Sequence, residues 1–220
     1  MREYLFEMHA HTSEVSPCAQ VPACEVVERY IGEGYDGLVI TDHMSPTVFA
    51  GHSFDTWEEK VSYFLTGYRK ARDAARGRIT VLFGMEIAFQ NETNDYLVYG
   101  ITEKFLLSNP DIIPMGFKRF SQLAAREGLP VFQAHPFRIG MKVANWRLLD
   151  GIEVYNGNSS HNSNNDIARL WAQKHRLRML SGSDFHRFFG ASPGGVYFPK
   201  KINGNRELVA ALKENDYRLK

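Results

Sequence analysis

The stretch EYLFEMHAH, residues 3–11, joins an apolar strand-like run, Glu3–Met8, to two histidines that follow it directly. Side chains on an extended backbone repeat every two residues, so His9 and His11 project in the same direction. Both imidazoles can therefore reach one metal ion, as paired histidine ligands do. One pair of histidines is a weak signal by itself, so its meaning depends on what the rest of the chain brings to the same place.

The composition is that of an ordinary globular protein, with 220 residues, of which 44% are hydrophobic and 23% charged. No repeat or linker divides the sequence, and we expect residues 1–220 to form one domain. The apolar runs are too short to cross a bilayer, and no secretory signal pattern precedes the first strand. Two cysteines, Cys18 and Cys24, are expected as reduced thiols, which fits a cytoplasmic protein. A net charge of +1 argues against a broad basic face for nucleic acid.

Short apolar runs alternate with helix-like segments along the chain. The expected strands are 3–8, 37–41, 79–85, 96–101, 131–134, 151–155 and 178–181. The expected helices are 23–33, 56–76, 115–127, 165–175 and 206–215. This alternation predicts an α/β fold with a largely parallel sheet, a class that includes barrels. The segments 42–55 and 136–150 are expected to be long loops.

Most of the metal-ligand candidates in the sequence come directly after one of these strands. They are His9, His11, Asp42, His43, Glu86, His135, Asn156, Asp184 and His186. In α/β folds, barrels included, chemistry collects at the carboxyl edge of the sheet, where strands end and loops begin. Random placement would not concentrate these side chains at one edge, so we predict a shared site there.

The donor types in this set indicate transition-metal ions. Imidazole nitrogen with carboxylate oxygen suits zinc, manganese or iron, whereas magnesium or calcium would favour mostly oxygen. One tetrahedral ion accepts fewer ligands than the five histidines of this set together with the acids Glu86 and Asp184. We therefore predict two or three divalent ions. A carboxylate such as Glu86 can bridge two ions. A centre of this kind generates hydroxide from bound water at neutral pH and clamps the oxygens of a phosphoryl group.

Six short stretches, taken in order and at these spacings, resemble the PHP (polymerase and histidinol phosphatase) family of metal-dependent phosphoesterases. They are His9–His11, Ile40–His43, Gly84–Ile87, Ala134–Pro136, Ile152–Asn156 and Ser181–His186. The resemblance covers about residues 3–190 and implies a distorted (β/α)7 barrel with a trinuclear site at the carboxyl ends of the strands. It implies these ligands: His9, His11, Glu86 and Asp184 for one ion, Glu86 and His135 for a second, and His43 and His186 for a third.

Two positions depart from the pattern of the family. Members often carry a histidine just before the fourth strand, where this sequence has Asp95. They also carry an aspartate or histidine shortly after the first histidine pair, where this sequence offers only Glu14, slightly early. We predict both as ligands, since a carboxylate can replace an imidazole. If neither Asp95 nor Glu14 is a ligand, we expect a site for two ions or a third ion that is weakly held.

Further residues are candidates for contact with a substrate. Arg138 could grip a phosphate in bidentate fashion and balance its charge, and Arg187 is a second candidate. Asn156 either contacts substrate or satisfies loop backbone. Asp42 is a candidate catalytic group, although it could instead hold a neighbouring histidine in one tautomer. Two loop histidines, His52 and His161, are expected to have no role.

The resemblance implies a hydrolase that acts on a small phosphomonoester or a nucleotide. Three alternatives stay open: a nuclease, which the near-neutral charge disfavours, a metal-binding domain without catalysis, and metal-assisted hydrolysis of another bond such as an amide. The expected partners are a small phosphorylated substrate and the metal ions, with no membrane. The sequence does not determine the oligomeric state.

Overall fold

A ten-stranded sheet forms the centre of the computed structural model, which describes residues 2–220. Its strands are β1 (Tyr4–Ala10), β2 (Gly37–Ile40), β3 (His43–Met44), β4 (Thr80–Ala88), β5 (Asp95–Tyr99), β6 (Val131–Gln133), β7 (Gly151–Asn156), β8 (Arg178–Gly182), β9 (Val196–Phe198) and β10 (Arg218–Leu219). All seven expected strands are present, with ends that shift by a few residues. The pair β9 and β10 extends the sheet beyond β1, and β3 adds to β4.

Seven strands form the wall of a nearly closed barrel. Hydrogen-bonded neighbours follow the order β1, β2, β4, β5, β6, β7 and β8. The two ends of this row meet at Phe185, just beyond β8. The N–H of Phe185 donates to the carbonyl of His9 at 3.2 Å, and the N–H of His11 donates to the carbonyl of Phe185 at 3.0 Å. The expected distorted (β/α)7 barrel is therefore confirmed.

One wall strand runs against the others. β1, β2 and β4 are parallel, as are β6, β7 and β8, whereas β5 pairs antiparallel with both β4 and β6. The connection 89–94 between β4 and β5 is short, and so short a connection joins antiparallel neighbours. Because β5 is reversed, its first residue, Asp95, lies opposite Ala88 near the end of β4. Asp95 thus reaches the edge where the other wall strands end.

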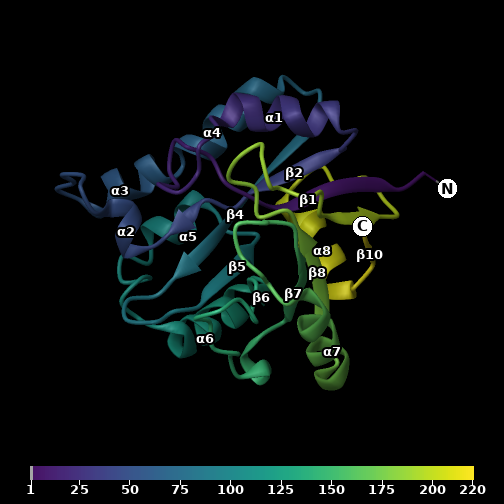
Figure 1. Cartoon of the computed structure of the whole chain (residues 1–220). Helices are drawn as coiled ribbons and strands as arrows, with labels where there is room; N and C mark the ends of the chain where they lie inside the picture. Colours follow the sequence, from purple (N-terminus) through teal and green to yellow (C-terminus); the bar gives the residue numbers. More distant parts are fainter. Residues whose placement is uncertain (1) are drawn as a thin grey trace.

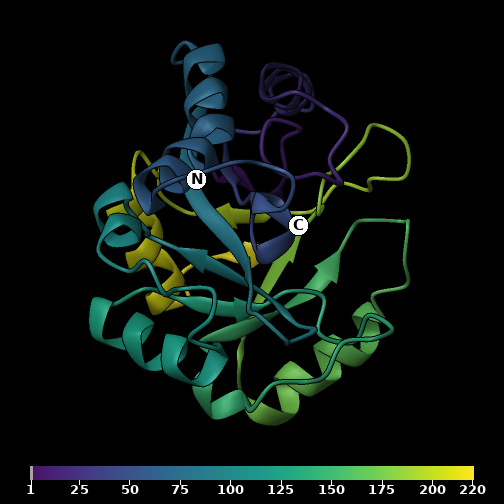
Figure 2. The same cartoon turned by 90° about the vertical axis from the view of Figure 1, so that its left-hand side faces the viewer.

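The helices lie outside the sheet, as Figures 1 and 2 show from two directions. They are α1 (Ala23–Gly32), α2 (Pro46–Phe49), α3 (Trp57–Phe64), α4 (Thr66–Ala75), α5 (Glu103–Leu107), α6 (Phe117–Glu127), the 3-10 turn η1 (Trp146–Leu148), α7 (Asn165–His175) and α8 (Asn205–Glu214). In Figure 1, α1 and α4 lie together above β2, and α6 and α7 lie on the opposite side of the barrel.

The expected helix 56–76 is divided into α3 and α4 at Leu65. The break turns α4 against the segment that follows β1. A Cβ on Gly67 would lie 2.1 Å from Thr12 Oγ1 and 2.3 Å from Asp42 Oδ2, so only glycine permits this approach. Six short elements were not predicted from the sequence: β3, β9, β10, α2, α5 and η1. Each has at most five residues, which is too few to show a hydrophobic period.

Buried apolar side chains fix the strands whose ends carry the candidate site. Phe6, Val39 and Leu97 of the wall strands pack in one cluster with Leu208 and Leu212 of α8. Two larger clusters join the sheet to the helices around it. Within residues 2–220, no helix has both the length and the apolar character needed to cross a membrane.

Candidate metal centre

The first group of donors contains two imidazoles and two carboxylates. His9 Nε2 and His11 Nε2 each lie 3.3 Å from Glu86 Oε2 and 3.3 Å from Asp184 Oδ1. The two histidines lie at the end of β1, Glu86 lies near the end of β4, and Asp184 lies two residues beyond β8. All four side chains are buried, and His9 Nε2, His11 Nε2, both Glu86 oxygens and Asp184 Oδ1 have no hydrogen-bond partner. Buried polar atoms that converge without partners are what a cation site requires, so these residues fit a metal ion.

Glu86 also belongs to a second group. Its Oε1 lies 3.2 Å from His135 Nε2, and that nitrogen lies 3.8 Å from Asp95 Oδ2. The two oxygens of Glu86 thus face different groups, which is the geometry of a bridging carboxylate. Asp95 reaches this place because β5 is reversed. The structure therefore brings the aspartate that departs from the family pattern into a group that could hold an ion.

A third group combines His11, His43 and His186. The ring of His11 lies 4.4 Å from that of His43 and 4.2 Å from that of His186, between centroids. His43 arrives through β3, which pairs with β4 and sets His43 beside Glu86. The sequence pattern suggested Glu14 as a further ligand here, and the geometry does not support it. Glu14 Oε2 instead accepts from the N–H of Ala23 at the start of α1, at 2.9 Å.

The thiol of Cys18 lies next to the third group, in the segment after β1 from which Glu14 was expected to supply a further ligand. Its Sγ lies 3.1 Å from His186 Nε2. Burial would raise the pKa of this thiol, but hydrogen bonds with His186 and His43 lower it to about 5. Burial would lower the pKa of His186, whereas its hydrogen bonds with Asp184 and Cys18 raise it to about 10.

A second layer of polar residues orients the donors. Glu153 Oε1 pairs with His9 Nδ1 at 2.9 Å, which leaves His9 Nε2 free to face Glu86 and Asp184. Asn156 Nδ2 donates to Glu153 Oε2 at 2.9 Å and to Asp184 Oδ2 at 3.1 Å. Asn156 therefore positions two carboxylates. The geometry favours this role over the direct substrate contact suggested by the sequence.

Asp42 also lies behind the donors. Its Oδ1 accepts from Ser16 Oγ at 2.7 Å, and Ser16 Oγ lies 3.2 Å from His11 Nδ1. Its Oδ2 accepts from Thr12 Oγ1 at 2.7 Å. Both oxygens are occupied and the residue is 2% exposed, so the geometry does not support Asp42 as a group that touches substrate. It supports the other sequence-based alternative, a carboxylate that orients a ligand histidine.

Charges within the centre are balanced in the absence of cations. Burial would lower the pKa of His9, but the carboxylates of Asp184 and Glu86 raise it well above its usual value. Burial would raise the pKa of Glu86, yet the imidazoles of His9 and His43 hold it well below its usual value. The carboxylates thus favour positive charge at the centre, which bound divalent ions would supply.

The backbone is strained at two donor residues. His135 has φ 26° and Asp184 has φ 50°, in the left-handed region that residues other than glycine rarely adopt. Glu153 Oε2 accepts from the N–H of His135 at 2.9 Å and helps to hold this conformation. Strain of this kind is concentrated at functional sites, and here it aims the two side chains at the donor groups.

An open cleft of about 380 Å³ lies over the donors. Arg138 and Arg187, the two arginines predicted from the sequence, both line it. So do Cys18 and His161, whose roles the sequence did not indicate. His161 Nε2 lies 3.4 Å from Asp184 Oδ2. The sequence offered one indication that Cys18 and His161 reach the cleft, namely their place in loops at the carboxyl edge of the sheet. That indication is weak, because His52 lies in another such loop and packs on Tyr63 instead.

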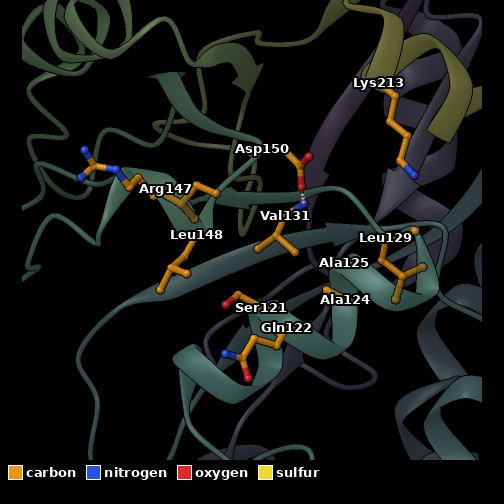
Figure 3. Close-up of a pocket in the computed structure, with 12 residues that line it drawn as sticks. Ser121, Gln122, Ala124, Ala125, Leu129, Val131, Arg147, Leu148, Asp150 and Lys213 are labelled. Carbon is orange, nitrogen blue, oxygen red and sulfur yellow. Dashed lines mark hydrogen bonds between the residues drawn. The ribbon is translucent and has the colours of Figure 1, made fainter.

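A second hollow, of about 350 Å³, lies between α6, η1 and the start of β6. Figure 3 shows Asp150 accepting from the N–H of Val131 there, with Leu148 and Leu129 along its walls. It contains no histidine and one acidic side chain, Asp150, which is already hydrogen-bonded. The cleft over the donors is therefore the candidate for chemistry.

Replacement of Glu153 by glutamine is expected to weaken metal binding about 10–100-fold, the usual effect of losing a partner of a ligand. The carboxylate accepts hydrogen bonds from His9, His135 and Asn156. A carboxamide offers only one acceptor oxygen, so at least one of these donors loses its partner. Competition with a chromophoric chelator measures the affinity. Glu207→Gln, at an exposed position of α8, is the control, and equal affinities for the two variants would contradict the assigned role.

The barrel and its converging histidines and carboxylates define a candidate metal-binding barrel with its site at the carboxyl ends of the strands. The chain belongs to the PHP domain family, whose model matches residues 7–217. None of the curated proteins compared matches the sequence.

Solved structures share the fold at low sequence identity. One is a two-domain protein from Bacteroides vulgatus containing a predicted PHP-like metal-dependent phosphoesterase (17% identity, TM-score 0.71, covering 100% of this chain and 65% of that one). Another is PsfC from Pseudomonas syringae (16%, TM-score 0.64, 97% and 95%). A third is the lesion-specific endonuclease PfuEndoQ from Pyrococcus furiosus (13%, TM-score 0.67, 99% and 58%). The chain thus spans less than two thirds of the first and third of these proteins.

Proposed function

We propose that the protein hydrolyses a small phosphate monoester, from a metabolite or a nucleotide, at a centre of two or three divalent ions. One observation carries this proposal: two arginines, Arg138 and Arg187, line the same cleft as the convergent donor atoms. Metal ions bound at the donor groups and the guanidinium groups of the two arginines would surround the cleft with positive charge. Such a cleft suits a substrate with concentrated negative charge. The volume of about 380 Å³ is at the lower end of the range for small-molecule sites.

The residues of the three groups would hold the ions. We assign His9, His11, Glu86 and Asp184 to the first, Glu86, Asp95 and His135 to the second, and His43 and His186 to the third. Zinc, manganese and iron all accept these donors. Bound there, the ions would activate a water molecule and neutralise the phosphoryl charge.

The protein side chains bind and orient the phosphate. Arg138 Nη2 lies 4.0 Å from Asp95 Oδ2, so its guanidinium stands beside the second group of donors. A bidentate contact with two phosphoryl oxygens from this position would fix the phosphorus over the centre. Arg187 approaches from the loop after β8, on another wall of the cleft. We infer that the two arginines orient the phosphate between them.

Purified protein supplied with Mn²⁺, Zn²⁺ or Fe²⁺ is expected to release inorganic phosphate from a generic monoester and from a subset of phosphorylated metabolites. Arg138→Ala is expected to lower kcat/KM about 10–100-fold, because a charge-assisted contact contributes about 1.5–3 kcal/mol. Arg147→Ala is the matched control, since Arg147 stacks on Trp146 outside the cleft. Bound ions without turnover of any monoester would overturn the proposal and favour a silent metal-binding domain.

A phosphodiester substrate is tested in the same assay. Cleavage of a generic diester or of an oligonucleotide in preference to every monoester would favour the nuclease alternative. Such activity would also fall steeply with added salt, because binding along a nucleic-acid backbone releases counterions. The net charge of +1 supports the small substrate instead. The cytoplasmic location stays a prediction.

A further inference from the structure

Cys18 lies in the segment between β1 and α1, directly against the third group of donors. Its Sγ is 3.1 Å from His186 Nε2 and also contacts the ring of His43. Both cysteines are exposed, but Cys24 lies on α1 and lines no part of the cleft, whereas Cys18 does line it. The thiol is thus one of two in the chain, and it is the one that faces two candidate ligand histidines.

Backbone and side-chain hydrogen bonds hold this segment in place. The N–H of Gln20 donates to the carbonyl of His186 at 2.8 Å, which ties the residues after Cys18 to the loop beyond β8. On the other side, Ser16 Oγ accepts from the N–H of His43 at 3.1 Å and donates to Asp42. Cys18 is therefore bounded on both sides by fixed residues, and its position beside the histidines follows from them.

A second observation points to an ion beside this group. His11, which groups with His43 and His186, is fully buried, and its Nε2 has no hydrogen-bond partner. Its Nδ1 is already used by Ser16 Oγ, so the open nitrogen is turned toward the donor groups. The carboxylate expected to complete the third group, Glu14, is directed to α1 and to Lys70 Nζ, 3.6 Å away. From the same segment, Cys18 instead turns its Sγ toward His186.

We propose that Cys18 is a metal ligand, and that with His43 and His186 it forms a cation site selective for thiophilic ions. This inference rests on the metal centre of the proposed function. Sulfur with two imidazoles is a donor set for zinc or iron, whereas manganese and magnesium prefer oxygen donors. The first two groups contain carboxylates and imidazoles only. The third site would therefore differ from them in which ion it takes.

Cobalt substitution tests the proposal without substrate. Protein titrated with Co²⁺ is expected to develop a sulfur-to-cobalt charge-transfer band in the near ultraviolet. Cys18→Ser is expected to abolish this band, and Cys24→Ser, the matched control, to keep it. Zinc content measured after equilibrium dialysis is expected to fall by one equivalent in Cys18→Ser, with manganese content unchanged. A band that persists in Cys18→Ser, or one that is absent from the native protein while ions bind at the other two groups, would overturn the assignment.

Alkylation gives a second readout. Saturating Zn²⁺ is expected to slow modification of Cys18 at least tenfold and to leave the rate at Cys24 unchanged. Equal effects on both thiols would contradict direct ligation of Cys18. Neither measurement depends on turnover, so an inactive protein that still has the band would refute the proposed function and support the ligand. An active protein without the band would support the proposed function and refute Cys18 as a ligand.

Discussion

Glu86→Gln is expected to lower phosphate release by about 10³-fold or more. Among residues 2–220, Glu86 alone belongs to two carboxylate-containing groups, with Oε2 near His9 and His11 and Oε1 near His135. The amide keeps the shape but removes the negative charge and one of the two acceptors. Loss of the bridge withdraws several kcal/mol of charge stabilisation, and about 1.4 kcal/mol corresponds to a tenfold change in rate.

Metal content separates this effect from a folding defect. The variant is expected to lose ions from both groups that share Glu86 and to keep its circular dichroism spectrum. Glu103→Gln is the matched control, because Glu103 pairs with Arg69 on the exposed surface of α5. Near-native activity and metal content in Glu86→Gln would remove the basis for a bridged centre.

Removal of the metal ions with a chelator is expected to abolish hydrolysis, and their return is expected to release protons. Burial lowers the pKa of His9 and His43, but the neighbouring carboxylates outweigh it and raise both well above their usual value. For His186 the balance leaves a pKa of about 10. At neutral pH these imidazoles carry protons in the metal-free protein, and each must lose its proton before it binds an ion.

The sign of the pH dependence follows directly. Apparent metal affinity should increase as the pH rises, because fewer protons have to be displaced. Calorimetric titration of the metal-free protein at one pH, in buffers of different ionisation enthalpy, measures the number of protons released. At least one proton for each ion bound at a histidine-containing group is expected. A binding enthalpy that is the same in every buffer would contradict the protonated state of the empty centre.

Much of the fold could be predicted from local patterns. The segments 23–33 and 165–175 appear as α1 and α7 with the expected bounds to within a residue, since the apolar spacing within each is helical. The helix 56–76 was predicted as one, because its apolar period continues through Leu65. In the structure the segment is divided at Leu65, and Gly67 of α4 lies against Thr12 and Asp42, which are far away in the sequence. No local pattern contains that contact.

The candidate site divides in the same way. Donors that follow parallel strands, such as His9 and Asp184, could be placed together because such strands end at one edge. The positions of Cys18 and His161 at the cleft could not be inferred, since each lies in a loop whose path depends on hydrogen bonds to other loops. Glu14 and Cys18 lie four residues apart in one such loop, and only the folded chain directs one to α1 and the other to His186.

The sequence by itself determined the alternation of strands and helices, the α/β class and the residue types gathered at the carboxyl edge of the sheet, whereas the barrel was implied by the family resemblance. Those properties depend on local periodicity and on the rule that parallel strands end together. The tertiary structure alone decided that β5 runs backwards and carries Asp95 to that edge, that Asp42 stands behind His11, and that a thiol faces the third group. These outcomes depend on contacts between distant segments, where packing and hydrogen bonding select one orientation among several that the local sequence allows.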